Sequence, residues 1–218
     1  MEPFKQHEVF ELETLQFMKN RRLLDSLVFG GGTMLRLCHG LNRYSVDLDF
    51  YLKEGVASGG YFKKLNEEFS GRYVISDSHN KRNTILVEIR HERYGMKLKI
   101  EINKKRHFTS FRTAIAFSPH AAMQVQVDTV SLPDMMNNKI EAFLSRKEIR
   151  DAFDIEFLLR RDVRFPDDKD KAGAVLKALK TLKKNDFNVK LGSLLPPEDR
   201  AYYRENRFAY LENYLTRI

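Results

Sequence analysis

A run of three glycines between an apolar segment and an amphipathic one constrains the fold more than any other feature. Leu27 begins a short apolar run, three glycines follow, and Thr33 opens a segment with helically spaced apolar residues that ends at Gly40. This pattern predicts a strand, a tight turn and a helix. Backbone N–H groups at such a turn point toward an anion, and the helix N-terminus adds partial positive charge. We therefore expect Gly31, Gly32 and Thr33 to cradle phosphate.

The next strand carries two aspartates. In residues 46–52, apolar side chains alternate with Asp47, Asp49 and Tyr51. Side chains two apart share one face of a strand, so the two carboxylates project together while the apolar set enters the core. The carboxylates repel each other unless a cation lies between them, and Mg²⁺ is the hard ion that takes oxygen ligands beside substrate phosphates. The alternative interpretation is a tight turn followed by a solvated strand face.

Glu101 is the candidate for a third carboxylate. Residues 96–103 alternate between apolar and polar, and Glu101 lies on the polar face with Lys97 and Lys99. A phosphate cradle beside a carboxylate-held metal is typical of phosphoryl or nucleotidyl transfer. Such chemistry needs a further carboxylate to complete a two-metal site or to deprotonate the attacking hydroxyl. The alternative is that Glu101 pairs across the sheet with Lys99 or Arg90.

Composition and charge indicate a globular protein with a polyanionic partner. Of the 218 residues, 42% are hydrophobic and 31% charged, and there is a single cysteine. No apolar run approaches the roughly 18 residues of a membrane span, and the polar, acidic N-terminus is unlike a signal peptide. We therefore expect a cytoplasmic protein. Residues 160–218 hold 14 Lys and Arg against 9 Asp and Glu, within a chain of net charge +8, and this excess favours a polyanion.

The remaining periodicity predicts an α+β fold in two parts. Helices are expected at residues 6–20 and 60–70, and strands at 73–77, 84–90, 96–103 and 124–129, the last at a sheet edge. A hairpin-length connection should pair the strands 84–90 and 96–103 antiparallel. From residue 132 the pattern becomes helical. We expect a small mixed sheet with helices on one face in residues 1–130, and a helical lobe in residues 131–218 that completes a cleft.

The turn and the Asp-x-Asp strand resemble a known family, the AbiEii-type nucleotidyltransferase toxins of the polymerase-β-like superfamily. The matching residues are Gly31-Gly32-Thr33, Gly40, Arg43, Ser45 and Asp47-Leu48-Asp49-Phe50. This resemblance implies a nucleotidyltransferase-like catalytic core, an NTP substrate, and Mg²⁺, with Mn²⁺ as the alternative ion. It implies Asp47, Asp49 and Glu101 as catalytic metal ligands, and a phosphate cradle that includes Ser45.

Two later segments are similar to motifs of the same family. Lys139 to Arg146 resembles a lysine-plus-arginine motif that reaches the triphosphate, where Arg43 would also neutralise charge. Arg150 to Asp154 resembles the last motif, which supplies an acid needed for activity. We choose Asp154 as this catalytic acid because it shares a helix face with Arg150. From the residues alone, Lys139 could instead snorkel to solvent, and the Arg-Asp-x-x-Asp pattern could be a surface ion-pair set.

The combined prediction is a Mg²⁺-dependent nucleotidyltransferase that moves an NMP from an NTP to an acceptor. By resemblance, the acceptor is tRNA and the role is the toxin of a toxin–antitoxin, phage-defence pair with a cognate antitoxin. An exposed stripe of Lys177, Lys180 and Lys184 on a helix expected at residues 171–184 independently favours RNA. The alternatives are transfer to a protein or small molecule, and a nucleotide- or RNA-binding module without turnover.

Overall fold

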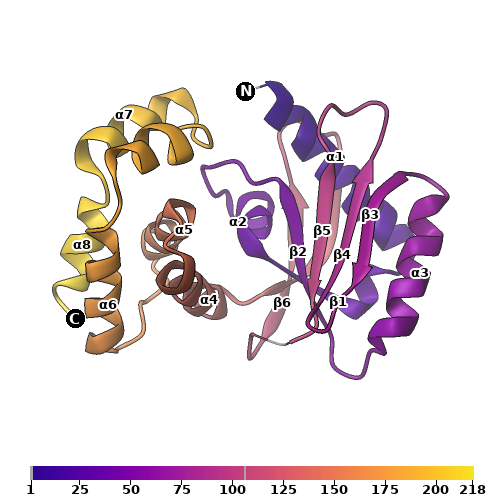
Figure 1. The fold of residues 1–218 in the computed structure, drawn as a ribbon, viewed down its shortest axis with the longest axis horizontal. Helices are drawn as coiled ribbons and strands as arrows, with labels where there is room; N and C mark the ends of the chain where they lie inside the picture. The colour runs from indigo at the N-terminus through magenta and orange to yellow at the C-terminus, as the bar shows by residue number, and fades with distance from the viewer. Residues whose placement is uncertain (1, 106) are drawn as a thin grey trace. The chain divides into compact units, whose positions relative to one another are not determined.

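The computed structural model describes residues 2–105 and 107–218, which form two compact units. Unit 1 spans residues 1–40 and 44–131, and unit 2 spans residues 41–43 and 132–218 (Figure 1). Unit 1 is a sheet with helices, and unit 2 is helical. No helix among the described residues is both long and apolar enough to cross a membrane.

Unit 1 is a seven-stranded mixed sheet. Its elements are α1 (Glu2–Asn20), the 3₁₀ turn η1 (Leu24–Ser26), β1 (Leu27–Gly30), α2 (Gly31–His39), β2 (Asp47–Leu52), α3 (Ser58–Ser70), β3 (Val74–Asn80), β4 (Thr84–Arg90), β5 (Leu98–Asn103), β6 (Phe111–Phe117) and β7 (Gln124–Val130). The strand order is β3-β4-β5-β2-β1-β7-β6. The pairs β1–β7 and β2–β5 are parallel, and the others are antiparallel. The α+β prediction is confirmed.

The sheet has one helix-covered face and one open face. On β2 and β5 every second residue is buried, including Phe50 and Ile100, whereas Asp49 and Glu101 on the opposite face are partly exposed. Helices α1 and α3 pack against each other, with the rings of Phe17 and Phe69 5.9 Å apart. The predicted carboxylates therefore lie on the open face, as expected because side chains two residues apart in a strand share a face.

The edge of the sheet beyond β1 differs from the sequence-based expectation. The strand at residues 124–129 was expected at an edge, but β7 lies between β1 and β6, and β6 itself was not predicted. On β6 the small residues Ala114 and Ala116 occupy the covered face, opposite Val127 and Val125. The large side chains, including Phe117, stay exposed. Because this reverses the usual pattern, hydrophobic alternation does not reveal the strand.

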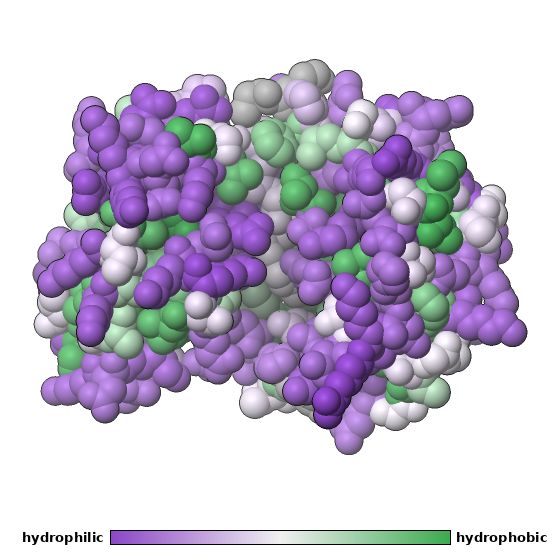
Figure 2. All heavy atoms as spheres, viewed as in Figure 1, coloured by the Kyte–Doolittle hydropathy of each residue, from purple (hydrophilic) through white to green (hydrophobic). Residues whose placement is uncertain are grey.

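Unit 2 is built from helices with an apolar core. It contains α4 (Leu132–Arg146), α5 (Ile149–Leu159), α6 (Lys169–Leu179), the π-helical turn η2 (Asp186–Leu191), α7 (Pro197–Asn206) and α8 (Ala209–Leu215). The helix expected at residues 171–184 is shorter in the structure, because α6 ends at Leu179 and Lys184 lies beyond it. Helices α7 and α8 are separated at Arg207, which has a φ of +49°. Hydrophilic residues predominate on the face of the protein shown in Figure 2, and apolar residues form separate patches there.

Candidate active site

The glycine turn brings the N-terminus of α2 against the Asp49 side chain. Gly31 has a φ of +73°, and a Cβ atom at this position would lie 2.1 Å from Asp49 Oδ2. Glycine is therefore required for both the backbone conformation and the space. Gly30 lies directly opposite Asp49 in the β1–β2 pairing. The first N–H groups of a helix lack acceptors within the helix, so Gly31 and Gly32 begin α2 where an anion can be bound.

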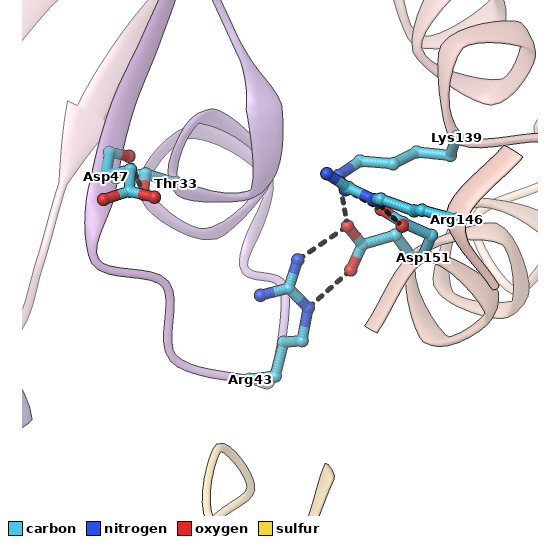
Figure 3. Close-up of polar contacts among 7 residues, drawn as sticks. Thr33, Arg43, Asp47, Lys139, Arg146 and Asp151 are labelled. Atoms are coloured by element: carbon cyan, nitrogen blue, oxygen red, sulfur yellow. Dashed lines mark hydrogen bonds and ion pairs between the residues drawn. The ribbon is translucent and has the colours of Figure 1, made fainter. Parts of the chain in front are cut away.

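Two hydrogen bonds hold the start of β2 through its backbone. The buried Thr33 hydroxyl donates to the Asp47 carbonyl oxygen at 2.6 Å (Figure 3). His7 Nε2 lies 2.9 Å from the Val46 carbonyl oxygen, and since a carbonyl can only accept, this nitrogen donates. The Thr33 proton is thus directed at the chain and not at a phosphate. Ser45, in the loop just before, is half-buried.

The three predicted carboxylates lie on the open face, with a lysine beside them. Asp49 pairs with Glu101 in the β2–β5 register, and Asp47 pairs with Lys99. Lys99 Nζ lies 3.2 Å from Asp47 Oδ2 and 3.4 Å from Glu101 Oε2. Burial alone would lower the pKa of Lys99, but the charges of Asp47 and Glu101 raise it, so the ammonium stays charged. Glu101 therefore pairs with Lys99 on its own strand and not across the sheet, and it lies opposite Asp49 in the register.

The donor set suits a hard divalent ion. Asp47 and Asp49 offer carboxylate oxygens from one strand face, and Lys99 already places a cation between Asp47 and Glu101. The described residues include no group of three or more His, Cys, Asp or Glu side chains arranged as a metal site. Mg²⁺, however, is usually held by one or two carboxylates together with substrate phosphates. The two aspartates fit that mode, whereas Glu101 as a third ligand remains a prediction.

Unit 2 contains a second group of charges, around Asp151 and Asp154 on α5 (Figure 3). Arg43 donates to both carboxylate oxygens of Asp154, at 2.6 and 2.7 Å. Lys139 Nζ lies 2.7 Å from Asp154 and 3.6 Å from Asp151. Arg146 donates to both oxygens of Asp151, each at 2.7 Å. These three cations therefore form ion pairs inside unit 2.

Burial and charge act in opposite directions on Asp154. The side chain is 0% exposed, and burial alone would raise the pKa of its carboxyl. The nearby charges of Arg43 and Lys139 outweigh burial and lower the pKa below its ordinary value. The carboxylate is therefore charged in the folded protein, and its two cations are needed to keep it so.

Three expectations about this group are corrected by the structure. Lys139 is 7% exposed and does not snorkel to solvent. Asp151 and Asp154 are both fully buried, so they are not a helix-surface ion-pair set. The partners of Asp154 are Arg43 and Lys139, and the ion pairs found among the described residues do not include one to the half-buried Arg150. Nucleotide binding by these basic residues remains a prediction.

Helix α1 supplies polar residues that sequence reasoning missed. His7, Glu11 and Thr14 are buried at i, i+4 and i+7, and neither carboxylate oxygen of Glu11 has a hydrogen-bond partner among the described residues. Burial first, and then the charge of Glu8, raises the pKa of Glu11 well above its ordinary value. Glu8 itself accepts from Arg36 and, at 2.7 Å, from Ser118. Polar residues at helical spacing within an otherwise apolar helix were the available signal.

A glycine turn at a helix start beside strand-borne carboxylates is typical of a nucleotidyltransferase. Comparison with protein families agrees, because residues 16–209 match the family described as "Nucleotidyl transferase AbiEii toxin, Type IV TA system". The chain belongs to this family, and it is accordingly a nucleotidyltransferase of a toxin–antitoxin system. The resemblance carried by the glycine turn and β2 is thereby confirmed.

Solved structures with low sequence identity share the fold. JHP933 from Helicobacter pylori is 20% identical, with a TM-score of 0.57 over 96% of this chain and 94% of that one. A putative nucleotidyltransferase from H. pylori is 19% identical, with 0.58 over 96% of both chains. MenT4, a nucleotidyltransferase toxin from Mycobacterium tuberculosis H37Rv, is 17% identical, with 0.58 over 97% and 86%. Comparison with curated protein sequences finds no match.

Proposed function

We propose that this enzyme transfers an NMP from an NTP to the 3′ end of an RNA, with tRNA as the acceptor, and acts in the cytoplasm. The observation that carries the proposal is the contact between the Gly31 turn and Asp49, because it joins an anion-binding helix start to a metal-binding carboxylate. The family supplies the activity and the toxin–antitoxin context. The acceptor, the metal and the roles of individual residues are what we add.

The sheet residues have complementary roles in this proposal. Asp47 and Asp49 would hold Mg²⁺ or Mn²⁺, and Glu101 would be a third ligand or the base that takes the proton of the attacking hydroxyl. A divalent ion bound there would neutralise charge on the triphosphate. Gly31 and Gly32 orient phosphate through backbone N–H groups. Phosphoryl transfer depends chiefly on such positioning and electrostatics.

Charge in unit 2 supports RNA as the acceptor. Lys177, Lys180 and Lys184 are all exposed, and they belong to residues 160–218, which hold 14 Lys and Arg against 9 Asp and Glu. Each phosphate that a lysine neutralises releases counterions, so RNA affinity should fall log-linearly with salt. Of the buried ion-pair group, Arg146 has the most exposed side chain, at 46%. It is therefore the best candidate there for binding triphosphate.

A labelling experiment tests the acceptor. The protein is incubated with Mg²⁺, each α-labelled NTP in turn and total tRNA, and the products are resolved on a denaturing gel. We expect label in RNA of tRNA length, and none with the Asp49→Asn variant. Label in protein or a small molecule, with none in RNA, would overturn the acceptor.

A charge-reversal series separates acceptor binding from nucleotide binding. Changing Lys177, Lys180 and Lys184 to Glu should weaken tRNA binding and leave NTP affinity, measured by calorimetry, unchanged. The matched control reverses three exposed lysines of unit 1, Lys63, Lys64 and Lys81, with the same change in net charge. Equal loss of tRNA binding in both variants would mean that net charge, and not the stripe, determines affinity.

A further inference from the structure

The edge strand β6 displays a row of apolar side chains on the open face. Phe111, Ile115 and Phe117 are 46%, 48% and 48% exposed. They are separated by even numbers of residues, so they project from the same side of the strand. The predicted active-site residues do not include this row, and helices α1 and α3 lie over the other face.

The strand register places this row on the same face as the catalytic carboxylates. Phe111 lies opposite Val130, and Gly30 lies opposite Asp49, which in turn lies opposite Glu101. The parallel pairing of Phe29 with Thr129 puts Val130 next to Gly30. Phe111 is therefore in one cross-strand line with the two acids. Three strand spacings of about 4.8 Å separate β6 from β2, or about 14 Å, which a few nucleotides can span.

Aromatic contacts connect the two ends of this line. Strands β5 and β6 lie on opposite sides of β2, β1 and β7, so the connection between them crosses these three strands. Phe108 in this connection is buried, with its ring 5.5 Å from Tyr51 on β2 and 6.4 Å from Phe111 on β6. Tyr51 follows Asp49 by two residues and so shares its face.

The surroundings of the row are polar and include Asp128, which lies opposite Thr113 between Phe111 and Ile115. Gln126 and Gln124 on β7 are exposed and lie opposite Ile115 and Phe117. Between Glu101 and Asp128 the sequence has four Lys or Arg residues, two His and no Asp or Glu. Asp128 itself is paired with Lys53, at 2.7 Å. Flat apolar rings with neighbouring amides match the chemistry of unpaired nucleic acid, which offers stacking bases and base-edge hydrogen bonds.

We infer that the outer face of β6 and β7 binds unpaired nucleobases of the acceptor RNA. We call this surface, formed by Phe111, Ile115, Phe117, Gln124 and Gln126, the base platform. Bases stack on Phe111 and Phe117, and the two glutamine amides donate to and accept from base edges. The inference rests on the proposed RNA acceptor and assigns the surface to which unpaired bases of that RNA bind. A peptide strand added at this edge would bind through backbone groups of β6 and would not require the face that carries the rings.

Binding measurements on truncated side chains test the base platform. Phe117→Ala and the double variant Phe111→Ala/Phe117→Ala are compared with Val74→Ala, which removes an exposed apolar side chain from the opposite edge strand, β3. Fluorescence anisotropy with a labelled ten-nucleotide single-stranded RNA should show affinity falling about tenfold for each ring removed. The slope of affinity against salt should not change, because no phosphate contact is lost. Val74→Ala should bind like the wild type.

The outcomes separate this inference from the proposed function. If the wild type labels RNA but the β6 variants keep full affinity for the single strand, the base platform is wrong and the function stands. If the variants lose single-strand affinity in a protein that labels no RNA, the acceptor is wrong and the base platform stands. A wild-type dimer in sedimentation that Phe117→Ala dissociates would assign the surface to a second copy and overturn the inference. Thermal melting checks folding, and Phe117→Ala alone suffices if loss of Phe111 destabilises the protein.

Discussion

The acidic residues on the open face of unit 1 and those on α5 of unit 2 are held in different ways. Asp154 is fully buried and has three close contacts to Arg43 and Lys139. Asp47 and Glu101 are partly exposed, and Lys99 contacts both of them at more than 3 Å. Two side chains therefore satisfy the charge of Asp154 internally, whereas Asp47 and Glu101 share Lys99.

This difference shows which acids are available to a ligand. A buried, bidentate ion pair is costly to break, because each partner would be left charged without solvent. A partly exposed carboxylate can exchange one cation for another at little cost. The sheet acids thus have the character of a binding site, while the α5 acids have the character of a structural centre. Substitution of the sheet acids should consequently reduce activity, whereas substitution of the α5 acids should reduce stability.

The largest effect should follow removal of charge from β2. Asp47→Asn and Asp49→Asn each remove a metal ligand without removing core volume, so NMP transfer should fall by at least about a hundredfold. The thermal midpoint should remain near that of the wild type. A gel-based transfer assay with differential scanning fluorimetry measures both quantities. Asp77→Asn on the edge strand β3 is the control, and full transfer by either β2 variant would contradict the metal assignment.

The opposite result is expected on α5. Asp154→Asn leaves Arg43 and Lys139 buried without their carboxylate, and breaking such a pair costs about 3–5 kcal/mol of stability. Urea denaturation followed by circular dichroism measures it, with Asp167→Asn, an exposed acid in the loop before α6, as the control. An Asp154 variant that keeps its stability but loses transfer would show that this acid acts in catalysis, as the family resemblance implies.

The juxtaposition of the glycine turn and the sheet carboxylates could be predicted from the sequence because its geometry is local. Asp47 and Asp49 share a face by the period of a strand, and Gly31 marks a backbone conformation that few other residues adopt. Predicting that Glu101 lies beside Asp49 required one further step, namely the placement of a second amphipathic strand next to the first. The register confirms this juxtaposition.

The ion pairs of unit 2 could not be predicted from local sequence patterns. Arg43 and Asp154 are 111 residues apart, and nothing in the spacing of Arg150 and Asp154 shows that the helix face they share is buried. His7 was missed for the same reason, since its partner, the Val46 carbonyl, lies 39 residues away. Local periodicity predicts the face of an element, but long-range partners depend on how the elements pack.

A smaller effect should follow replacement of the lysine shared by the sheet acids. Lys99→Met leaves Asp47 and Glu101 without their cation, so the metal-free protein should lose roughly 0–1 kcal/mol of stability, as for other partly exposed pairs. Addition of Mg²⁺ should then raise the thermal midpoint more than it does in the wild type. Lys97→Met, on the same side of the hairpin but paired with Glu88, is the control. An equal response to Mg²⁺ in wild type and Lys99→Met would indicate that Lys99 does not compete with the ion.

An effect that depends on pH is expected at Glu11. Its raised pKa arises from burial, and Glu8 and Asp47 raise it further while Arg36 opposes them. An acid whose pKa is raised on folding stabilises the protein fully below its unfolded pKa, and this contribution is lost as pH rises through the folded pKa. The lowered pKa of Asp154 has the opposite sign, so its contribution is lost as pH falls.

Glu11→Gln keeps the shape of the side chain and removes its titration. Within the window above the ordinary carboxyl pKa, the stability of the variant relative to wild type should therefore rise by up to about 1.4 kcal/mol for each pH unit. Urea titrations at pH 5 and pH 8 measure this difference, with Glu13→Gln on the same helix as the control. A relative stability that is constant between the two pH values would show that Glu11 is not held in its protonated form. The polar group of α1 would then need a compensating charge or ordered water near His7 and Thr14.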